Sequence, residues 1–197
     1  MNKTEPILIT VLRHGKVEGR AGVLRGSNDA VLSEEGVMQM NLALERVESK
    51  SFDMVATSPL SRCHDFAALY AKRFGMPLQV IEKFREINFG LWEGLIPGEA
   101  ACTLDEYRAF LDNRSGPPSG ESLSEFRGRV SRGWTEWMLQ SCGNNRLLIT
   151  HAGVMRALLM ELFGLIPEQT FQFALPEAAC MRISHLEGQV PFLLSLN

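Results

Sequence analysis

The chain has 197 residues, of which 45% are hydrophobic and 22% are charged, as in an ordinary globular protein with one large core. Its net charge of −3 argues against nucleic acid or an anionic membrane as a partner, so an anionic ligand would need a local basic pocket. The apolar run 7–12 is too short for a signal peptide or a membrane span, and four scattered cysteines without a Cys-x-x-Cys pair favour reduced thiols in the cytoplasm.

Short apolar runs alternate with longer stretches of helical character, a pattern typical of an α/β fold with a mainly parallel sheet. We expect buried strands over residues 7–12, 54–57, 78–81 and 146–150. The expected helices cover 33 to about 49, with Ser33 as the cap, then 60–74, 104–111, 123–139 and 154–163. Loops are expected at 85–98 and 113–120. Two last strands, 179–184 and 190–196, are expected to add an antiparallel edge to the sheet.

Basic and histidine side chains follow three of the expected strands, at the point where each strand ends. The first strand runs into Arg13 and His14, the second is followed by Arg62, and the fourth runs into His151. In an open parallel sheet, ligands bind outside the carboxyl ends of the strands, so these side chains are expected to converge. The helices that start after these strand ends would point free N–H groups at the same place, which favours an anion there.

Such a set predicts a pocket for a phosphate group with a nucleophile inside it. Guanidinium groups bind phosphate oxygens through paired hydrogen bonds, and a neutral imidazole attacks phosphorus when its other nitrogen is held by an acceptor. Neither an acidic cluster nor a His-x-x-x-His spacing accompanies the set, so no metal and no other cofactor is expected. Each residue alone is also typical of a structural or surface side chain, but three such strand ends together favour catalysis.

Five motifs extend over most of the chain: Arg13-His14-Gly15, Leu32-Ser33-Glu34-Glu35-Gly36, Ser58-Pro59-Leu60-x-Arg62, Glu86-x-x-Phe89-Gly90-x-Trp92-Glu93-Gly94 and Thr150-His151-Ala152-Gly153-Val154. In type and order they resemble the motifs of the histidine phosphatase superfamily, also called the phosphoglycerate mutase-like family. The resemblance implies a single domain over 1–197. It also implies a three-layer α/β/α sandwich whose mainly parallel sheet has an antiparallel C-terminal edge.

The resemblance implies a role for each matching residue. His14 is the expected nucleophile, and a phosphohistidine would divide the hydrolysis of a phosphate monoester into two easier steps. Arg13, Arg62 and a protonated His151 are expected to hold the transferring phosphoryl group. Glu86 is the expected proton donor to the leaving oxygen, a role that its surroundings in the sequence would not suggest.

The expected substrate-binding positions depart from the family pattern. Many members have an asparagine near the sixth position after the histidine, where this chain has Arg20. Arg20 or Arg25 is the candidate replacement, and Gly26 and Ala152 are further expected contacts. The segment 95–120 is expected to cover the active site. Three of its side chains are candidates for contact with the leaving group, although packing within a surface helix is the alternative for each: Tyr107, Phe110 and Arg114.

The segment Leu24-Arg25-Gly26-Ser27-x-Asp29 resembles the alpha-ribazole phosphatases of cobalamin biosynthesis, which implies alpha-ribazole 5'-phosphate as the substrate. The alternatives among enzymes are a broad-specificity sugar-phosphate or phosphoglycerate phosphatase, a mutase, and a metal-dependent hydrolase. Outside enzymes, the alternative is a non-catalytic module that binds a phosphorylated ligand. The expected partner is a small phosphomonoester, and the chain is expected to be a monomer or a homodimer.

Overall fold

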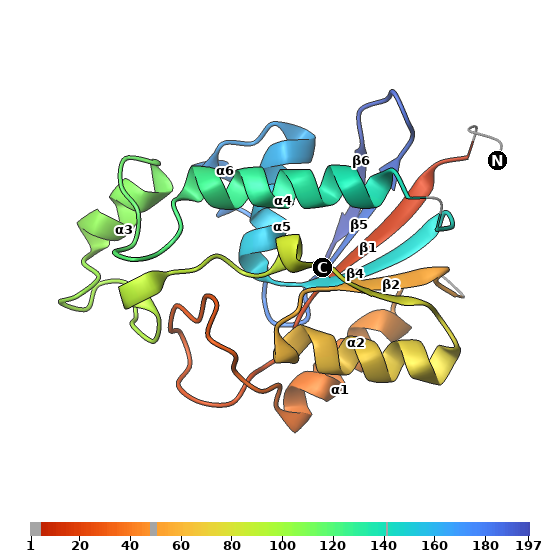
Figure 1. The fold of residues 1–197 in the computed structure, drawn as a ribbon, viewed down its shortest axis with the longest axis horizontal. Helices are drawn as coiled ribbons and strands as arrows, with labels where there is room; N and C mark the ends of the chain where they lie inside the picture. Colours follow the sequence, from red (N-terminus) through yellow and green to blue (C-terminus); the bar gives the residue numbers. More distant parts are fainter. Residues whose placement is uncertain (1–4, 48–50, 141) are drawn as a thin grey trace.

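The computed structural model describes residues 5–47, 51–140 and 142–197, and a six-stranded sheet runs through it (Figure 1). The strands are β1 (Ile7–Arg13), β2 (Met54–Thr57), β3 (Leu78–Val80), β4 (Asn145–Thr150), β5 (Cys180–His185) and β6 (Phe192–Leu196). Their order is β3-β2-β4-β1-β5-β6; β1 to β4 are parallel, whereas β5 and β6 pair antiparallel with their neighbours. The predicted mainly parallel sheet with an antiparallel C-terminal edge is therefore confirmed.

Helices cover both faces of the sheet, which confirms the predicted three-layer sandwich (Figure 1). On one face lie α1 (Glu34–Glu45) and α2 (Ser61–Phe74), and on the other lie α4 (Leu123–Met138) and α5 (Ala152–Phe163). The shorter α3 (Leu104–Leu111) lies away from the sheet, near the start of α4, and α6 (Pro167–Thr170) follows α5. None of the described helices has the length and apolar character needed to cross a membrane.

Alternating side chains along the strands give the sheet a packed core on each face. In β1, Ile9 and Val11 belong to the core under α4 and α5, whereas Leu12 belongs to the core under α1 and α2. In β4, Leu148 and Ile149 divide between the two cores in the same way. Because both faces are covered, the strands read as continuous apolar runs, as parallel strands do. Each such side chain stabilises the fold by about 1.5–3 kcal/mol through burial.

Local signals set the ends of the helices on one face of the sheet, α1 and α2. Ser33 caps α1 by accepting a hydrogen bond from the Gly36 N–H at 3.0 Å. At the end of α2, Gly75 takes the left-handed conformation, with a φ of 66°, that closes a helix. α1 ends at Glu45, and the predicted end near residue 49 lies outside the described residues.

Three short elements were not predicted from the sequence. Two 3₁₀ turns, Glu82–Phe84 and Gly90–Trp92, lie before and inside the expected loop 85–98, and α6 begins at Pro167. Each has at most four residues, which is too short for the helical period of apolar residues to show.

Candidate active site

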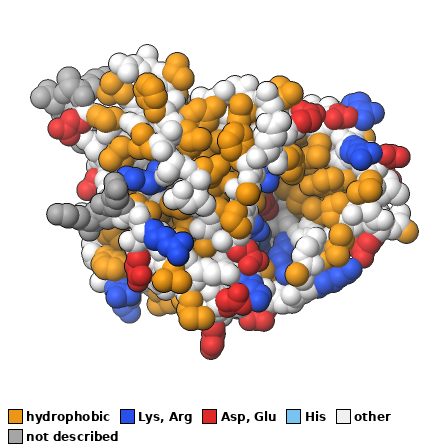
Figure 2. Space-filling view, turned by 180° about the vertical axis from the view of Figure 1, so that it is seen from behind, with side chains coloured by type: hydrophobic (Ala, Val, Ile, Leu, Met, Phe, Trp, Pro, Cys, Tyr) orange, Lys and Arg blue, Asp and Glu red, His pale blue; other side chains and the backbone are white. Residues whose placement is uncertain are grey.

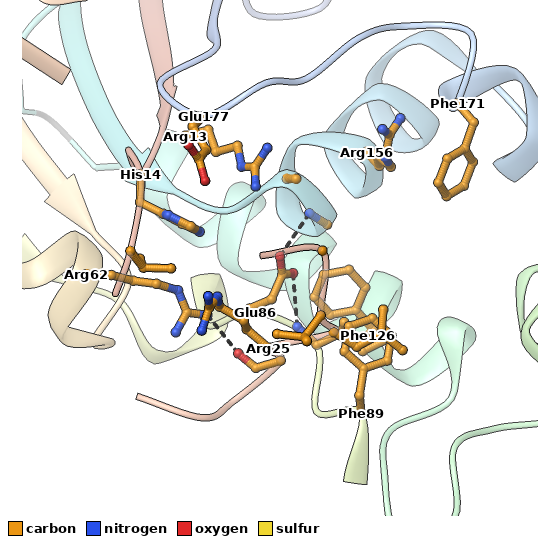
Figure 3. Close-up of a pocket in the computed structure, with 18 of the residues that line it drawn as sticks. Arg13, His14, Arg25, Arg62, Glu86, Phe89, Phe126, Arg156, Phe171 and Glu177 are labelled. Atoms are coloured by element: carbon orange, nitrogen blue, oxygen red, sulfur yellow. Dashed lines mark hydrogen bonds between the residues drawn. The ribbon is translucent and has the colours of Figure 1, made fainter. Parts of the chain in front are cut away.

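A cavity of about 490 Å³ opens beyond the carboxyl ends of β1, β2 and β4, where the sequence predicted a site. Figure 2 shows this face hollowed, with Lys and Arg side chains in and around the hollow. Figure 3 shows that the cavity has a basic end and an apolar end. The basic end carries Arg13, His14, Arg25 and Arg62, and the apolar end is lined by Phe89, Tyr107, Phe110, Leu123, Phe126, Met160 and Phe171. Glu86 lies between the two ends.

The His14 imidazole is oriented and neutral. Its Nδ1 donates to the Gly15 carbonyl at 2.8 Å, since a carbonyl only accepts, and Nε2 then carries the free electron pair. Burial lowers the pKa of His14 to about 3, with further lowering by the charges of Arg62 and Arg13. Near neutral pH the ring therefore keeps its electron pair. Among the described residues Nε2 has no hydrogen-bond partner, and the ring points into the cavity (Figure 3).

Two glycines explain why the motifs around His14 and at the start of α1 occur together. A Cβ on Gly15 would collide with the Gly36 carbonyl, and a Cβ on Gly36 would collide with the Lys16 backbone. The close approach of these two segments holds the residues after β1 against the first turn of α1. The position of His14 therefore depends on both glycines.

Arg62 is only 1% exposed, and its guanidinium group lines the cavity. Hydrogen bonds hold this group in place. Its Nη1 and Nη2 donate to the carbonyls of Asn28 and Gly26, each at 2.7 Å, and Nε donates to His151 Nδ1 at 3.3 Å. Each Nη nitrogen carries a second N–H, which these bonds do not use. The guanidinium is thus fixed in place with donors left for a ligand.

His151 is placed differently from the expectation. Its ring centre lies 5.3 Å from that of His14, but the side chain is fully buried and does not line the cavity. Nε2 is 2.7 Å from the Ser58 hydroxyl, and Nδ1 accepts from Arg62. Burial and the charge of Arg62 hold the pKa of His151 well below its usual range, so the expected protonated imidazole is corrected to a neutral one. In this geometry His151 accepts a hydrogen bond from Arg62 and helps to orient its guanidinium group.

Arg13 brings a second cation to the basic end. Its Nη1 donates to the Leu175 carbonyl at 2.5 Å, whereas the buried Nε has no hydrogen-bond partner among the described residues. Burial lowers the pKa of Arg13, and the charges of Glu86 and Glu177 oppose that change. The guanidinium stays charged, as arginine does in proteins, and keeps donors for a ligand anion.

Glu86 is a half-buried carboxyl group at the boundary of the two ends. Its oxygens accept from the backbone N–H groups of Ile87 at 3.1 Å and Gly153 at 3.0 Å. Burial raises the pKa of Glu86, against the effect of these two hydrogen bonds and of nearby arginines. A Cβ on Gly153 would collide with this carboxyl group, which explains the glycine two residues after His151. A carboxyl group with a raised pKa suits proton donation.

An ion pair that the sequence did not reveal holds the loop of Glu86. Arg129 of α4 binds both oxygens of Glu121, at 2.9 and 2.7 Å, and the pair is largely buried. The same guanidinium donates to the carbonyls of Lys83 and Arg85, at 3.0 and 2.9 Å, and to that of Glu86 at 3.4 Å. The Arg129–Glu121 pair therefore fixes the backbone that carries the Glu86 carboxyl group.

The four expected substrate-binding residues do not all reach the cavity. Arg25, Gly26 and Ala152 line it, whereas Arg20 is absent from its walls. The Arg20 guanidinium instead pairs with Glu99 at 2.8 Å on the surface. Of the two arginines considered for the missing asparagine, Arg25 alone is therefore placed near the basic end.

The apolar end combines expected and unexpected residues. Tyr107 and Phe110 line it, whereas Arg114 is exposed and pairs with Asp112 outside the cavity. Phe110 is itself buried, with its ring centre 6.1 Å from that of Trp92. Further lining residues come from α4, α5 and the segment after α6 without a signal in the sequence: Phe126, Arg156 and Phe171 at the apolar end, and Glu177 beside Arg13 at the basic end.

In the described part of the chain, no group of three His, Cys, Asp or Glu side chains is arranged to hold a metal ion. All four cysteines are free thiols, and Cys63 lies buried beside His151, with its sulfur 3.7 Å from either ring nitrogen.

A model of the histidine phosphatase superfamily (branch 1) matches residues 9–197. The chain belongs to this superfamily. The match runs from β1 through β6 and includes every motif quoted above, so the resemblance seen in the sequence is confirmed. Members of this superfamily are phosphatases and mutases.

Similar proteins are named for different substrates. A phosphoglycerate mutase from Schizosaccharomyces pombe is 31% identical over 175 residues, which are 83% of each chain. The alpha-ribazole phosphatase structure from Shigella flexneri is 25% identical, covers 97% of this chain and 96% of its own, and has a TM-score of 0.83. A phosphoserine phosphatase from Entamoeba histolytica, in complex with 3-phosphoglyceric acid, shares the fold with a TM-score of 0.80 at 23% identity and 96% coverage of each chain. The family model establishes the superfamily, and the similar proteins carry the names of different substrates.

Proposed function

We propose that this histidine phosphatase superfamily member is a phosphomonoesterase that works through a phosphohistidine on His14. The observation that carries the proposal is the state of that imidazole. Its Nδ1 is held by a carbonyl, its pKa lies at about 3, and its Nε2 faces a cavity end with two fixed guanidinium groups. A neutral, oriented nitrogen beside cations is what attack on a phosphate dianion requires.

In the first step, the Nε2 electron pair of His14 forms the bond to phosphorus as the ester P–O bond breaks. Arg13 and Arg62 stabilise the charge on the other phosphoryl oxygens, an effect worth about 3–4 kcal/mol for a single well-placed donor. Glu86 donates its proton to the leaving oxygen, so the leaving group departs as an alcohol. General acid help of this kind is worth about 10²–10⁴ in rate.

In the second step, water attacks the phosphohistidine from the side that the alcohol has left. Glu86, now ionised, takes the water proton, the N–P bond breaks, and inorganic phosphate is released. His14 regains its electron pair and Glu86 its proton, so both residues return to the starting state. A mutase would differ only in passing the phosphoryl group to a second hydroxyl group in place of water.

The first candidate substrate is alpha-ribazole 5'-phosphate. It is supported by the likeness to an alpha-ribazole phosphatase over nearly the whole chain and by the aromatic walls of the apolar end. A flat base can pack between such rings, for which stacking is worth about 1–3 kcal/mol in nucleic-acid sites.

A second candidate is a phosphorylated small acid, as the names of other superfamily members suggest. The observation in its favour is a further cation, Arg156, in the wall of the apolar end.

We also propose roles for the segment 95–120 and for Arg25. Residues 95–120 would cover the active site, because Tyr107 and Phe110 from this segment line the apolar end. Arg25 would contact the phosphate and replace the missing asparagine. A cytoplasmic location and a single domain over 1–197 remain predictions from the sequence.

The experiment is phosphate release from p-nitrophenyl phosphate, alpha-ribazole 5'-phosphate, 3-phosphoglycerate, phosphoserine and a hexose phosphate. Turnover of p-nitrophenyl phosphate is expected, and exhaustive chelation of metals is expected to leave it unchanged. A protein that only binds phosphorylated ligands would turn over none of the five. A tenfold preference in kcat/KM for another natural substrate over alpha-ribazole 5'-phosphate would remove the cobalamin hypothesis and leave the phosphatase.

A further inference from the structure

Arg156, in the second turn of α5, is a charged side chain of the apolar end that the proposed chemistry does not use (Figure 3). Its guanidinium carbon lies 4.2 Å from the centre of the Phe171 ring. Its Nη1 donates to the Thr170 carbonyl and, at 3.5 Å, to the Phe173 carbonyl. The guanidinium is therefore fixed on one side by a ring and two carbonyls, all from the segment that follows α5.

The other side of this guanidinium has no partner in the protein. Among the described residues, Nε and Nη2 of Arg156 make no hydrogen bond, and no carboxylate pairs with the side chain. These two nitrogens form the edge of a guanidinium that binds both oxygens of a carboxylate side by side. A fixed, half-buried cation with this edge free is prepared for an anion, since little side-chain freedom remains to be lost on binding.

Arg156 and the basic end line the same cavity, so a single ligand can contact both. Burial lowers the pKa of Arg156, and the charges of Arg13 and Glu86 also act on it. Glu86 lies between the ends, and the aromatic rings of Phe89 and Phe126 lie below the space that separates Arg62 from Arg156 in Figure 3. A ligand that joins the two cationic places can therefore pack a flat, apolar middle on these rings, beside Glu86.

We propose that Arg156 forms a carboxylate subsite, so that the preferred substrate is a phosphomonoester whose leaving group carries a carboxylate across a flat, apolar middle. The proposal rests on the proposed function for the reacting end and favours its second candidate, a phosphorylated acid, over alpha-ribazole 5'-phosphate by naming the class of leaving group. Alpha-ribazole 5'-phosphate has the flat middle but no carboxylate, and would leave the free edge of Arg156 unused.

Two matched probes test the subsite, 4-carboxyphenyl phosphate and 4-carbamoylphenyl phosphate, which have the same shape and differ in charge. We expect the wild-type protein to favour the carboxylate in kcat/KM by about 10- to 100-fold, the range of a charge-assisted hydrogen-bond pair. Arg156→Met should bring the ratio of the two values close to one. Arg156→Lys keeps the charge without the paired donors and should give an intermediate ratio.

Two control variants separate the subsite from general attraction of anions. Arg114→Met removes an exposed arginine of the 95–120 segment that pairs with Asp112 outside the cavity, and should leave the ratio unchanged. Arg25→Met removes a cation of the basic end, and should lower turnover of both probes by a similar factor because both carry the same phosphate.

Binding of the matched 4-carboxybenzyl and 4-carbamoylbenzyl phosphonates, measured by calorimetry, gives a readout without a leaving group. Equal affinity of the wild-type protein for the two phosphonates would overturn the subsite, as would a carboxylate preference that survives in Arg156→Met. Turnover of both phenyl phosphates with equal phosphonate affinities would leave the proposed function standing without the subsite. No turnover, with tenfold tighter binding of the carboxylate phosphonate, would support the subsite and contradict the proposed function.

Discussion

The two ends of the cavity are built from different kinds of structure. At the basic end, Arg13, His14 and Arg62 lie within five residues of the end of a strand, so the sheet itself fixes their spacing. At the apolar end, the walls come from α3, α4, α5 and the segment after α6, which no strand pairing holds in register. The comparison shows how a superfamily can keep one reaction while its members differ in substrate: the chemistry depends on the topology, and the leaving group meets the more variable helices and loops.

The largest effect that would test this comparison is expected at Glu86, which lies between the two ends of the cavity. Glu86→Gln is expected to slow hydrolysis of alkyl phosphates by about 10²–10⁴, because a poor leaving group needs the proton. The loss on p-nitrophenyl phosphate should be far smaller in the phosphorylation step, since that leaving group departs without protonation. Pre-steady-state kinetics on both substrates measure the difference. Equal losses would mean that Glu86 has a structural role.

The pH profile of kcat/KM tests the protonation state of the same residue. Burial raises the pKa of Glu86, so its donating form persists to higher pH and kcat/KM should fall as the pH rises through that pKa. This limb should be missing in Glu86→Gln. The pKa of His14 is about 3, so its loss of activity by protonation should come near that pH and no limb should appear near 6.5. A histidine limb near 6.5 would contradict the neutral state assigned to His14.

A change at Arg62 tests whether the basic end serves all substrates alike. Arg62→Met should lower kcat by about 10²–10³ on every phosphomonoester, as the loss of one fixed donor to a transition state does. It should also lower thermal stability, because the carbonyls of Gly26 and Asn28 lose their partner, at about 1–3 kcal/mol for a buried group left unpaired. A loss that varied strongly with the leaving group would show that the two ends are not separate.

The sequence could predict the basic end because its residues follow strands. Buried parallel strands are legible as short apolar runs, and the rule that ligands bind at their carboxyl ends brings Arg13, His14 and Arg62 together without coordinates. The six strands were found with ends that differ by at most two residues. His151 was found in the same way, yet its lowered pKa comes from burial and from the charge of Arg62, and side-chain burial of that kind has no signal in a sequence.

The sequence could not predict the apolar end or the Arg129–Glu121 pair for the same reason. Arg129 and Arg156 look like ordinary helix arginines, and what they bind is decided by tertiary packing between segments far apart in the chain. Arg129 contacts carbonyls 43 to 46 residues away, and Arg156 contacts a segment beyond the end of its own helix. Arg20 shows the opposite case, since its place in the sequence suggested the pocket and its side chain pairs with Glu99 on the surface.

The Arg129–Glu121 pair should act on the reaction through Glu86. Arg129→Met is expected to lower kcat by about 10-fold, since a small displacement of a catalytic group costs between 10- and 100-fold. The same change made in Glu86→Gln should have much less effect, because the group it positions is already lost. A double-mutant cycle on an alkyl phosphate measures this coupling. Additive losses would mean that Arg129 acts elsewhere.

The smallest expected effects distinguish two arginines of the loop after His14. Arg25→Ala should raise KM by about 10-fold on every substrate, in line with a charged hydrogen bond to phosphate. Arg20→Ala should change kcat/KM by less than about twofold, because exposed ion pairs contribute little and its partner Glu99 lies outside the cavity walls. Steady-state kinetics of the two variants decide between them. The reverse order would mean that Arg20 takes the place of the missing asparagine.

The central claim is that His14 carries the phosphoryl group during turnover. Rapid quenching of the wild-type protein with substrate, followed by intact-mass and peptide mapping, should find one phosphoryl group on His14 that is labile in acid and stable in base. His14→Ala should show neither this group nor turnover of p-nitrophenyl phosphate. Phosphorylation at another residue, or activity that persists in His14→Ala, would contradict the account.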